Sequence, residues 1–323
     1  MACLKPVILG CSGLVLTPEE RQFFAEIRPF GFILFKRNCS SVAQLKALVD
    51  SLRDSVEDAT VPVFIDQEGG RVARLNAPVW DGGKAFRVLG EAYEQDPEAG
   101  SRQIIAQTEK MAAQLLEVGI NGNCAPVLDL MIEGASEAIG DRTVSADPEV
   151  VAACGRLVVQ TYLDSGIFPI IKHMPGHGRV QVDPHIDLPF VDAPLSELEA
   201  DFKPFIALRE APLAMNCHVL FRAIDNDFPV SLSKKAHAEI IRGRIGYAGL
   251  ILSDDVSMGS LKMPLAERGL AVLEAGADIA LFGTGNLEDS QAVCSTLPVM
   301  KDESLLRWQK AQESCRKQAT LAV

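Results

Sequence analysis

Short apolar runs alternate with longer amphipathic stretches along the whole chain. Eight of these runs have the length of a strand and are apolar at successive positions rather than at every second position. Strands of this kind are covered on both faces, as in a parallel sheet that packs against helices. The predicted strands span residues 7–11, 31–35, 61–66, 122–128, 168–173, 213–218, 249–254 and 278–283.

The stretches between these runs carry apolar residues at helical spacing. In residues 41–56 the apolar positions recur about every 3.6 residues, and Ser40 or Ser41 is placed to cap the helix. Ser196 and Glu199 have the spacing of a capping box, and Asp147 precedes a proline at a first helical position. The predicted helices span residues 41–56, 97–118, 147–165, 196–210, 233–245 and 265–275.

Eight strands that alternate with helices over roughly 300 residues predict a single (β/α)8 TIM barrel. An open, doubly wound sheet is the structural alternative, because the same alternation of strands and helices suits both folds. No linker rich in serine, glycine or proline divides the chain, so we expect residues 1–323 to form one domain.

Composition narrows the functional class. Apolar residues make up 48% of the chain and charged residues 23%, as in a globular protein. The net charge of −12 and the absence of any basic tract argue against binding to nucleic acid or to an anionic membrane surface. The first apolar run, which ends at Cys11, is shorter than the roughly 7–15 residues of a signal sequence, and no run approaches the ~20 residues of a membrane span.

The eight cysteines form no CxxC pair and no tight cluster. Several lie inside apolar runs, where a free thiol behaves as a small hydrophobic residue. This pattern is typical of a reducing compartment rather than of a disulfide framework or a zinc ribbon. We therefore expect the protein in the cytoplasm.

Polar side chains stand where several predicted strands end. The third strand ends in Asp66, the fifth in Lys172 and His173, and the seventh in Asp254, which Asp255 follows. The carboxyl ends of barrel strands meet at one face, and that face carries the catalytic groups of TIM-barrel enzymes. We therefore expect these side chains to share one site.

Histidines concentrate after the fifth strand, where three of the five in the chain lie. His173 and His177 have a spacing that binds zinc on a helix, but Pro175 lies between them, so we predict no metal site. Asp183 lies two residues before His185 and could orient its ring and raise its pKa towards neutrality, as a general acid/base requires. A solvated pair of loop residues is the alternative.

Three other features also have competing interpretations. Lys172 could form a Schiff base, as in barrel aldolases, or could bind a substrate hydroxyl. Asp254 could cap the next helix, although two adjacent acids at a barrel mouth carry an electrostatic cost that favours chemistry. Gly69 and Gly70 lack the residues that follow in a phosphate loop, so we predict a tight turn.

Several blocks of the sequence resemble glycoside hydrolase family 3. Residues 240–244 (IIRGR) and 249–257 (GLILSDDVS) are similar to its active-site signature. Residues 65–72 (IDQEGGRV) and 172–178 (KHMPGHG) resemble two further blocks in the same order. The resemblance extends over about residues 6–287. It is to the single-domain bacterial β-N-acetylglucosaminidase branch, which acts in peptidoglycan recycling.

The resemblance implies a role for each matching residue. It implies that Asp254 is the catalytic nucleophile, that His185 is the general acid/base and that Asp183 orients His185. His177 belongs to one of the matched blocks, and we expect a structural role for it by default. The resemblance also implies that the sugar in the −1 pocket is held by Asp66, Arg74, Arg142, Lys172 and His173.

The resemblance further implies a retaining enzyme without a cofactor that removes β-linked N-acetylglucosamine from muropeptides, as a monomer rather than an obligate oligomer. Departures from the branch include Pro184, Met174 and the sequence from Asn216 to His218, and none removes a catalytic group. The alternatives are a β-glucosidase or a phosphorylase of the same family, a mechanism in which the substrate's acetamido group attacks, a Schiff-base lyase and a non-catalytic sugar-binding barrel.

Overall fold

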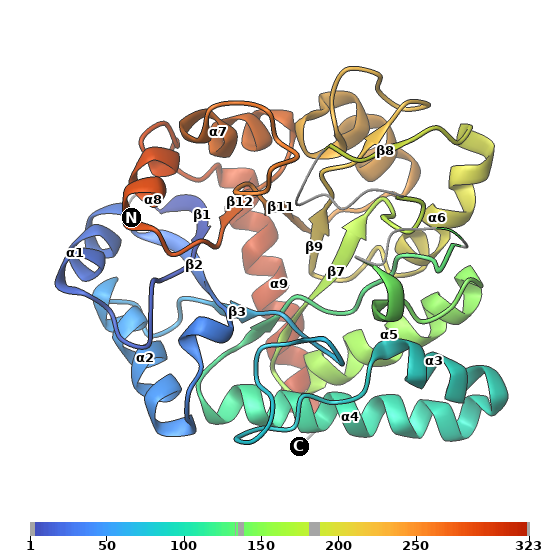
Figure 1. Cartoon of the computed structure of the whole chain (residues 1–323), viewed down its shortest axis with the longest axis horizontal. Helices are drawn as coiled ribbons and strands as arrows, with labels where there is room; N and C mark the ends of the chain where they lie inside the picture. Colours follow the sequence, from blue (N-terminus) through green and yellow to red (C-terminus); the bar gives the residue numbers. More distant parts are fainter. Residues whose placement is uncertain (1–3, 133, 135–138, 181–187, 322–323) are drawn as a thin grey trace.

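A computed structural model describes residues 4–132, 134, 139–180 and 188–321, the last six of these by their backbone alone. Within these residues, eight parallel strands form a closed barrel in the order β1-β12-β11-β9-β7-β6-β3-β2 (Figure 1). The predicted TIM barrel is therefore confirmed, and the open sheet is excluded. The barrel strands are β1 (Lys5–Leu9), β2 (Pro29–Leu34), β3 (Val63–Ile65), β6 (Gly122–Asn123), β7 (Phe168–Met174), β9 (Leu213–Asn216), β11 (Leu250–Asp255) and β12 (Ile279–Phe282).

Each predicted strand corresponds to one barrel strand, but the fourth is much shorter than predicted. The expected strand covered residues 122–128, whereas β6 ends at Asn123. Pro126 lacks an N–H group and cannot donate to a ladder. The chain nevertheless stays beside β7, because the carbonyl of Pro126 accepts from the Lys172 N–H at 3.2 Å and Leu128 donates to the Lys172 carbonyl at 2.7 Å.

The predicted helices are also present. They correspond to α2 (Val42–Ser55), α4 (Pro97–Glu117), α5 (Pro148–Asp164), α6 (Leu195–Ala207), the π-helical segment η4 (Ala236–Arg244) and α7 (Leu265–Ala275). Ser41 caps α2, and Asp147 caps α5 by accepting from the Glu149 N–H. The capping box at Ser196 is wrong, because α6 already begins at Leu195 after Pro194.

The described part of the chain contains further elements that the pattern did not predict. Thr17 and Glu20 form a capping box at the start of α1, so a local signal for this helix existed. Helix α1 spans Pro18–Ile27. The other helices that the pattern did not predict are α3 (Phe86–Gln95), α8 (Leu287–Cys294) and α9 (Asp302–Leu321). Short turns of 3₁₀ helix are η1 (Lys36–Asn38), η2 (Gly140–Arg142) and η3 (Val230–Leu232).

In the described part of the chain, two small sheets lie outside the barrel. Strand β4 (Gln67–Gly69) pairs with β5 (Val72–Ala73) in an antiparallel hairpin, and β8 (Phe190–Val191) pairs with β10 (Leu220–Phe221). In the β4–β5 turn Gly69 and Gly70 have φ values of 105° and 60°. Side chains disfavour this backbone region, so the predicted tight turn is confirmed.

Helix α9 closes the amino-terminal end of the barrel. Figure 1 shows it crossing the far end, and the ring of Trp308 lies 4.9 Å from that of Phe30 and 4.8 Å from that of Phe168. These aromatic side chains join the barrel interior, which also contains Ile170 and Leu213. The opposite, carboxyl-terminal end of the barrel is therefore the end that can hold a site.

The carboxylate of Asp278, at the start of β12, ties this closed end together. It accepts from Arg242 at 3.0 Å, from the Ile251 N–H at 2.9 Å, from Ser304 at 2.6 Å and from Arg307 at 2.7 Å. Arg242 belongs to the block at residues 240–244 that was matched to an active-site signature. Its side chain therefore serves the fold at the closed end, while Asp254 of the same signature lies at the opposite, carboxyl-terminal end of β11.

None of the described helices combines the length and the apolar character that crossing a bilayer requires.

We predict that Asp278→Ala lowers the free energy of unfolding by about 3 kcal/mol, because it removes a buried acceptor to which two arginines, a serine and a backbone N–H donate. Urea unfolding followed by circular dichroism measures the change. Asp50→Ala is the control, because the Asp50 side chain is 54% exposed in a surface pair with Lys46 and its loss should cost less than about 0.5 kcal/mol. Equal effects of the two substitutions would contradict the role of Asp278.

Candidate active site

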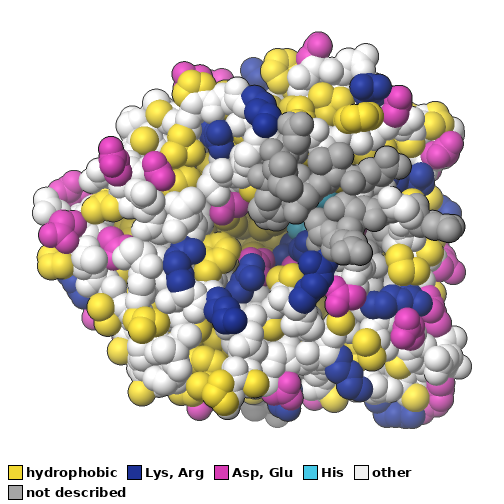
Figure 2. Space-filling model, viewed as in Figure 1, with side chains coloured by type: hydrophobic (Ala, Val, Ile, Leu, Met, Phe, Trp, Pro, Cys, Tyr) yellow, Lys and Arg dark blue, Asp and Glu magenta, His cyan; other side chains and the backbone are white. Residues whose placement is uncertain are grey.

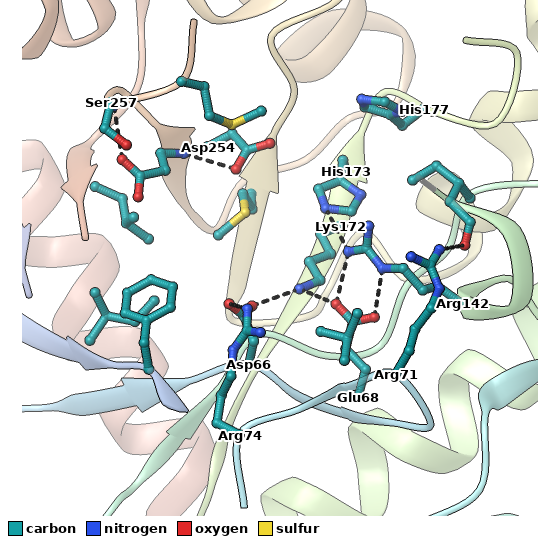
Figure 3. Close-up of a pocket in the computed structure, with 18 residues that line it drawn as sticks. Asp66, Glu68, Arg71, Arg74, Arg142, Lys172, His173, His177, Asp254 and Ser257 are labelled. Carbon is teal, nitrogen blue, oxygen red and sulfur yellow. Dashed lines mark hydrogen bonds and ion pairs between the residues drawn. The ribbon is translucent and has the colours of Figure 1, made fainter. Parts of the chain in front are cut away.

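A cavity of about 320 Å³ opens at the carboxyl-terminal ends of the barrel strands. Figure 2 views this face and shows lysine and arginine side chains around the hollow. The apolar part of the wall includes Phe35, Met215 and Met258. Its charged and polar side chains are Asp66, Glu68, Arg71, Arg74, Arg142, Lys172, His173, His177, Asp254, Asp255 and Ser257 (Figure 3).

Lys172 lies at the centre of the charged wall. Its side chain, near the end of β7, is 2% exposed, and its ammonium group lies 3.0 Å from Asp66 Oδ1 and 2.6 Å from Glu68 Oε1. Both carboxylates come from the segment that follows β3, and Arg74 holds the other oxygen of Asp66 at 3.0 Å. The ends of β3 and β7 are thus joined by charge pairs that point into one cavity.

Arg142 extends this network from the 3₁₀ turn η2. Its guanidinium group donates twice to Glu68, through Nε at 2.8 Å and Nη2 at 2.9 Å. Bidentate pairs of this kind fix both partners in orientation. Nη2 of Arg142 also lies 3.4 Å from Nε2 of His173, which brings the arginine network next to the histidines.

Asp129 positions both histidines of the cavity from behind. It is fully buried, and its carboxylate lies 2.7 Å from His173 Nδ1 and accepts from the backbone N–H groups of His173 and His177. A carboxylate that accepts from Nδ1 leaves the Nε2 atom of His173 facing the cavity. The ring of His177 meets that of His173 edge-on, with 5.6 Å between centroids.

Asp254 and Asp255 end strand β11 with their carboxylates turned apart. The backbone N–H of Asp255 donates to Asp254 Oδ1 at 2.8 Å. The carboxylate of Asp255 accepts instead from the N–H groups of Ser257 at 2.8 Å and Gly283 at 3.2 Å. Figure 3 shows the Asp254 carboxylate on the side of the cavity that faces His173 and His177.

These surroundings separate the protonation behaviour of the two acids. Burial favours the neutral form of Asp254, but attraction to His173 and His218 and the Asp255 N–H outweigh burial and hold its pKa below the usual value. Burial raises the pKa of Asp255 to about 6, and the charge of Asp254 adds to the rise. Asp254 therefore stays ionised across the neutral range, whereas Asp255 takes up a proton as the pH falls towards about 6.

The ion pairs keep the other acids and Lys172 charged. Burial opposes ionisation of Asp66 and Glu68, yet Lys172 and the arginines hold the pKa of Asp66 far below its usual value and that of Glu68 at about 2. Burial likewise opposes the charge of Lys172, but the two carboxylates raise its pKa above the usual value. Burial lowers the pKa of His177 to about 4, so its ring is neutral at pH 7.

Most of the residues expected in a site are brought together here. Asp183 and His185 lie outside the described residues. His177 was assigned a structural role by default, but it is part of the cavity wall. The expected residues that line the cavity are Asp66, Arg74, Arg142, Lys172, His173 and Asp254. Among the residues described, no group of histidine, cysteine and acidic side chains is arranged to hold a metal ion.

Sequence reasoning missed Glu68 and Asp129. Asp129 follows the apolar run of the fourth predicted strand, which is the same signal that identified Asp66 and Asp254. Glu68 lies two residues after Asp66, but its partners Arg142 and Lys172 are distant in the sequence. Only the closed barrel brings these partners to it.

Comparisons with known proteins match most of the chain. Residues 17–306 match the family described as "Glycosyl hydrolase family 3 N terminal domain". A protein of Alkalilimnicola ehrlichii named "Beta-hexosaminidase" is 38% identical over 291 residues, which are 86% of this chain and 80% of that protein. One of the same name from Bordetella avium is 36% identical over 282 residues, 85% of this chain and 79% of that protein.

Two solved structures resemble the barrel. Native NagZ from Neisseria gonorrhoeae has a TM-score of 0.86 and 28% identity, and the match covers 99% of this chain and 98% of that one. A glycoside hydrolase family 3 β-N-acetylglucosaminidase from Paenibacillus sp. str. FPU-7 has a TM-score of 0.87 and 27% identity. This second match covers 98% of this chain but 62% of the Paenibacillus chain.

We predict that Glu68→Gln lowers the free energy of unfolding at pH 7 by about 3 kcal/mol. The pKa of Glu68 is about 2 in the folded state and about 4.3 in the unfolded state, and a difference of this size corresponds to about 3 kcal/mol. A carboxyl group whose pKa is lower in the folded state stabilises that state at pH values above its unfolded pKa. This contribution is lost as the pH falls towards the folded pKa. The gap between wild type and variant should therefore be full at pH 5–7 and narrow below about pH 4.

Urea unfolding at each pH from 7 to 3 tests this prediction. The matched control is Glu91→Gln, since Glu91 is 51% exposed in a surface pair with Arg87 and should show little effect at any pH. A gap for Glu68→Gln that stays constant over this pH range would contradict the ion-pair explanation.

Proposed function

The chain belongs to glycosyl hydrolase family 3, and from this premise we propose that it is a retaining exo-β-N-acetylglucosaminidase that uses Asp254 as its nucleophile. The observation that carries the proposal is the state of Asp254. It is an ionised carboxylate at the end of a barrel strand, held by one backbone N–H, and it faces a cavity lined by fixed hydrogen-bonding groups. A nucleophile in a glycosidase requires this combination.

The charged wall suits a polyhydroxylated ring. Lys172, Arg74 and Arg142 present N–H donors, and Asp66 and Glu68 present acceptors, and their mutual pairing fixes them before any sugar binds. Fixed groups lose little conformational entropy on binding. We propose that Asp66, Arg74, Arg142, Lys172 and His173 hold the sugar hydroxyls in the −1 pocket.

We further propose His185 as the general acid/base and Asp183 as the residue that orients it, on the strength of their sequence pattern. The histidines in the described wall are poorly suited to this task. The ring nitrogen of His173 that Asp129 leaves open, Nε2, lies 3.4 Å from Nη2 of Arg142 and so faces this charged donor rather than a leaving group. The ring of His177 is neutral at pH 7 and so is not the protonated acid that the leaving group needs.

The proposed reaction is a double displacement. The Asp254 oxygen attacks the anomeric carbon while protonated His185 gives its proton to the departing glycosidic oxygen, and a glycosyl ester forms. Neutral His185 then takes a proton from water, whose oxygen attacks the same carbon and releases Asp254 as carboxylate. Both steps invert the centre, so the configuration is retained overall.

The structure weighs against two rival mechanisms. Attack by the substrate's own acetamido group needs an acidic pair that polarises it, whereas the carboxylates of Asp254 and Asp255 point to different partners. A Schiff-base lyase needs a deprotonated lysine, whereas Lys172 is held as a cation between two carboxylates.

The names of the matched relatives support N-acetylglucosamine over glucose as the sugar. We propose that the natural substrate is a muropeptide from peptidoglycan recycling, and that hydrolysis rather than phosphorolysis predominates. We also propose that the protein acts in the cytoplasm as a monomer. A single domain is part of the proposal and is supported by the packing of α9 on both α5 and β11.

We predict that the protein releases nitrophenol from 4-nitrophenyl β-N-acetylglucosaminide, and that Asp254→Asn lowers kcat by at least about 10³-fold, because no covalent intermediate can form. Asp50→Asn, far from the cavity, should retain wild-type activity. Release from the β-glucoside alone would contradict the choice of sugar, and sugar 1-phosphate in phosphate buffer would indicate a phosphorylase. No release from either glycoside would contradict the proposed function.

We predict that His185→Ala lowers kcat/KM by about 10²–10⁴-fold for an unactivated disaccharide, because the leaving oxygen then departs without a proton. A dinitrophenyl glycoside has a stable leaving group, so it should show a much smaller loss and an initial burst, and added azide should speed its turnover. Steady-state and stopped-flow assays measure both substrates. An equal loss on both, or no loss, would contradict the assignment of His185.

A further inference from the structure

We propose that the imidazole of His177 contacts the substituent at C2 of the bound sugar and is a determinant of the preference for an acetamido group over a hydroxyl. The inference rests on the proposed function for the position of the anomeric carbon beside Asp254. It concerns a different residue and a different property, which is the discrimination between two sugars.

His177 is fixed in the cavity wall by its backbone. Its N–H donates to Asp129 Oδ1 at 2.7 Å, and its ring packs edge-on against His173. The whole residue is 3% exposed, yet its side chain lines the cavity. The ring therefore has one orientation before a ligand arrives.

The ring of His177 lacks a hydrogen-bond partner within the described part of the chain. Among the described residues Nδ1 is buried without a partner and Nε2 is in no hydrogen bond either, so Nε2 is the ring nitrogen open to the cavity. By contrast, the neighbouring His173 uses Nδ1 to bind Asp129 and brings Nε2 close to Arg142. Buried polar groups are normally paired, so an unpaired ring in a cavity wall points to a group that arrives with the ligand.

The direction of the sugar follows from the two ends of the cavity. C1 must lie against Asp254, and the hydroxyls farthest from C1 suit the charged groups around Lys172. The substituent at C2 is then the one closest to both C1 and the histidine wall. His177 lies on that wall, close enough to Asp254 for each to affect the other's pKa (Figure 3).

The chemistry of a neutral imidazole fits an acetamido group. The Nε2 atom of the ring either donates to the carbonyl of the acetamido group or accepts from the N–H of that group, depending on which ring nitrogen carries the proton. A protonated ring beside C1 would also repel the positive charge that develops on the sugar in the transition state. The neutral state of His177 avoids that cost.

His237 provides a matched control. Like His177, it is a 3% exposed histidine whose pKa burial lowers to about 4, and its Nδ1 is also without a partner among the described residues. It faces Asn216 and Gly276 rather than the cavity. A loss caused only by disturbing a buried histidine should therefore occur in variants of both residues.

The test measures kcat/KM for the 4-nitrophenyl β-glycosides of N-acetylglucosamine and glucose in wild type, His177→Ala, His177→Asn and His237→Asn. We expect His177→Ala to lower the value for N-acetylglucosamine by about 10–100-fold and that for glucose by less than about threefold. His177→Asn should recover part of the selectivity, because an amide also donates and accepts. His237→Asn should change both sugars by the same factor.

Calorimetric binding of the hydroximolactone analogues of the two sugars gives the same comparison without turnover. This measurement distinguishes failure of the proposed function from failure of the inference about His177. A wild type that hydrolyses neither glycoside contradicts the proposed function, while the ratio of the two binding constants still reports on His177. A ratio unchanged in both His177 variants would overturn the inference. Equal losses for the two sugars would overturn it as well, since they would indicate a role in folding or in general positioning.

Discussion

The site depends on the burial of one ammonium group between two carboxylates. Lys172 has almost no contact with solvent, and a lone cation there would cost several kcal/mol. Asp66 and Glu68 compensate that cost only if β3 and β7 are correctly placed in the closed barrel. Lys172, Asp66 and Glu68 can therefore stay charged inside the barrel only because the fold brings them together. Their pairing also holds the donors and acceptors of the cavity wall in place before a sugar enters.

The same constraint explains why the chemistry is confined to one end. Parallel strands deliver Asp66, Lys172 and Asp254 to the same face because each residue stands at the carboxyl end of its strand. The opposite face is closed by α9, with Trp308 against two aromatic rings and Asp278 bound to two arginines. At the amino-terminal end of the barrel the buried ion pairs of Asp278 thus stabilise the fold. At the carboxyl-terminal end the charged side chains also line a cavity.

The fold and much of the site could be predicted from the sequence because the signals were local. Strands buried on both faces are apolar throughout, and polar residues at their ends are easily seen, so the barrel and Lys172 followed from the pattern. Asp129 carried the same local signal as Asp66 and was overlooked, whereas Glu68 was missed because its partner Arg142 lies 74 residues away. A pairing at that separation is set by the order of strands in the barrel, which local periodicity does not contain.

Local signals also misled in places. Ser196 and Glu199 have the spacing of a cap, but Pro194 starts α6 one residue earlier, since a proline fits the beginning of a helix. His177 was assigned a structural role by default, whereas it lies in the cavity wall, where its backbone N–H donates to Asp129.

The central claim is that Asp254 forms a covalent bond to the sugar. The most direct test is to incubate the protein with a 5-fluoro glycosyl fluoride of N-acetylglucosamine, digest it and analyse the peptides by mass spectrometry. We expect one added fluorosugar on the peptide that contains Asp254, and loss of that adduct when a competing substrate is present. A sugar attached to another residue, or turnover of the reagent that never yields an adduct, would contradict this claim.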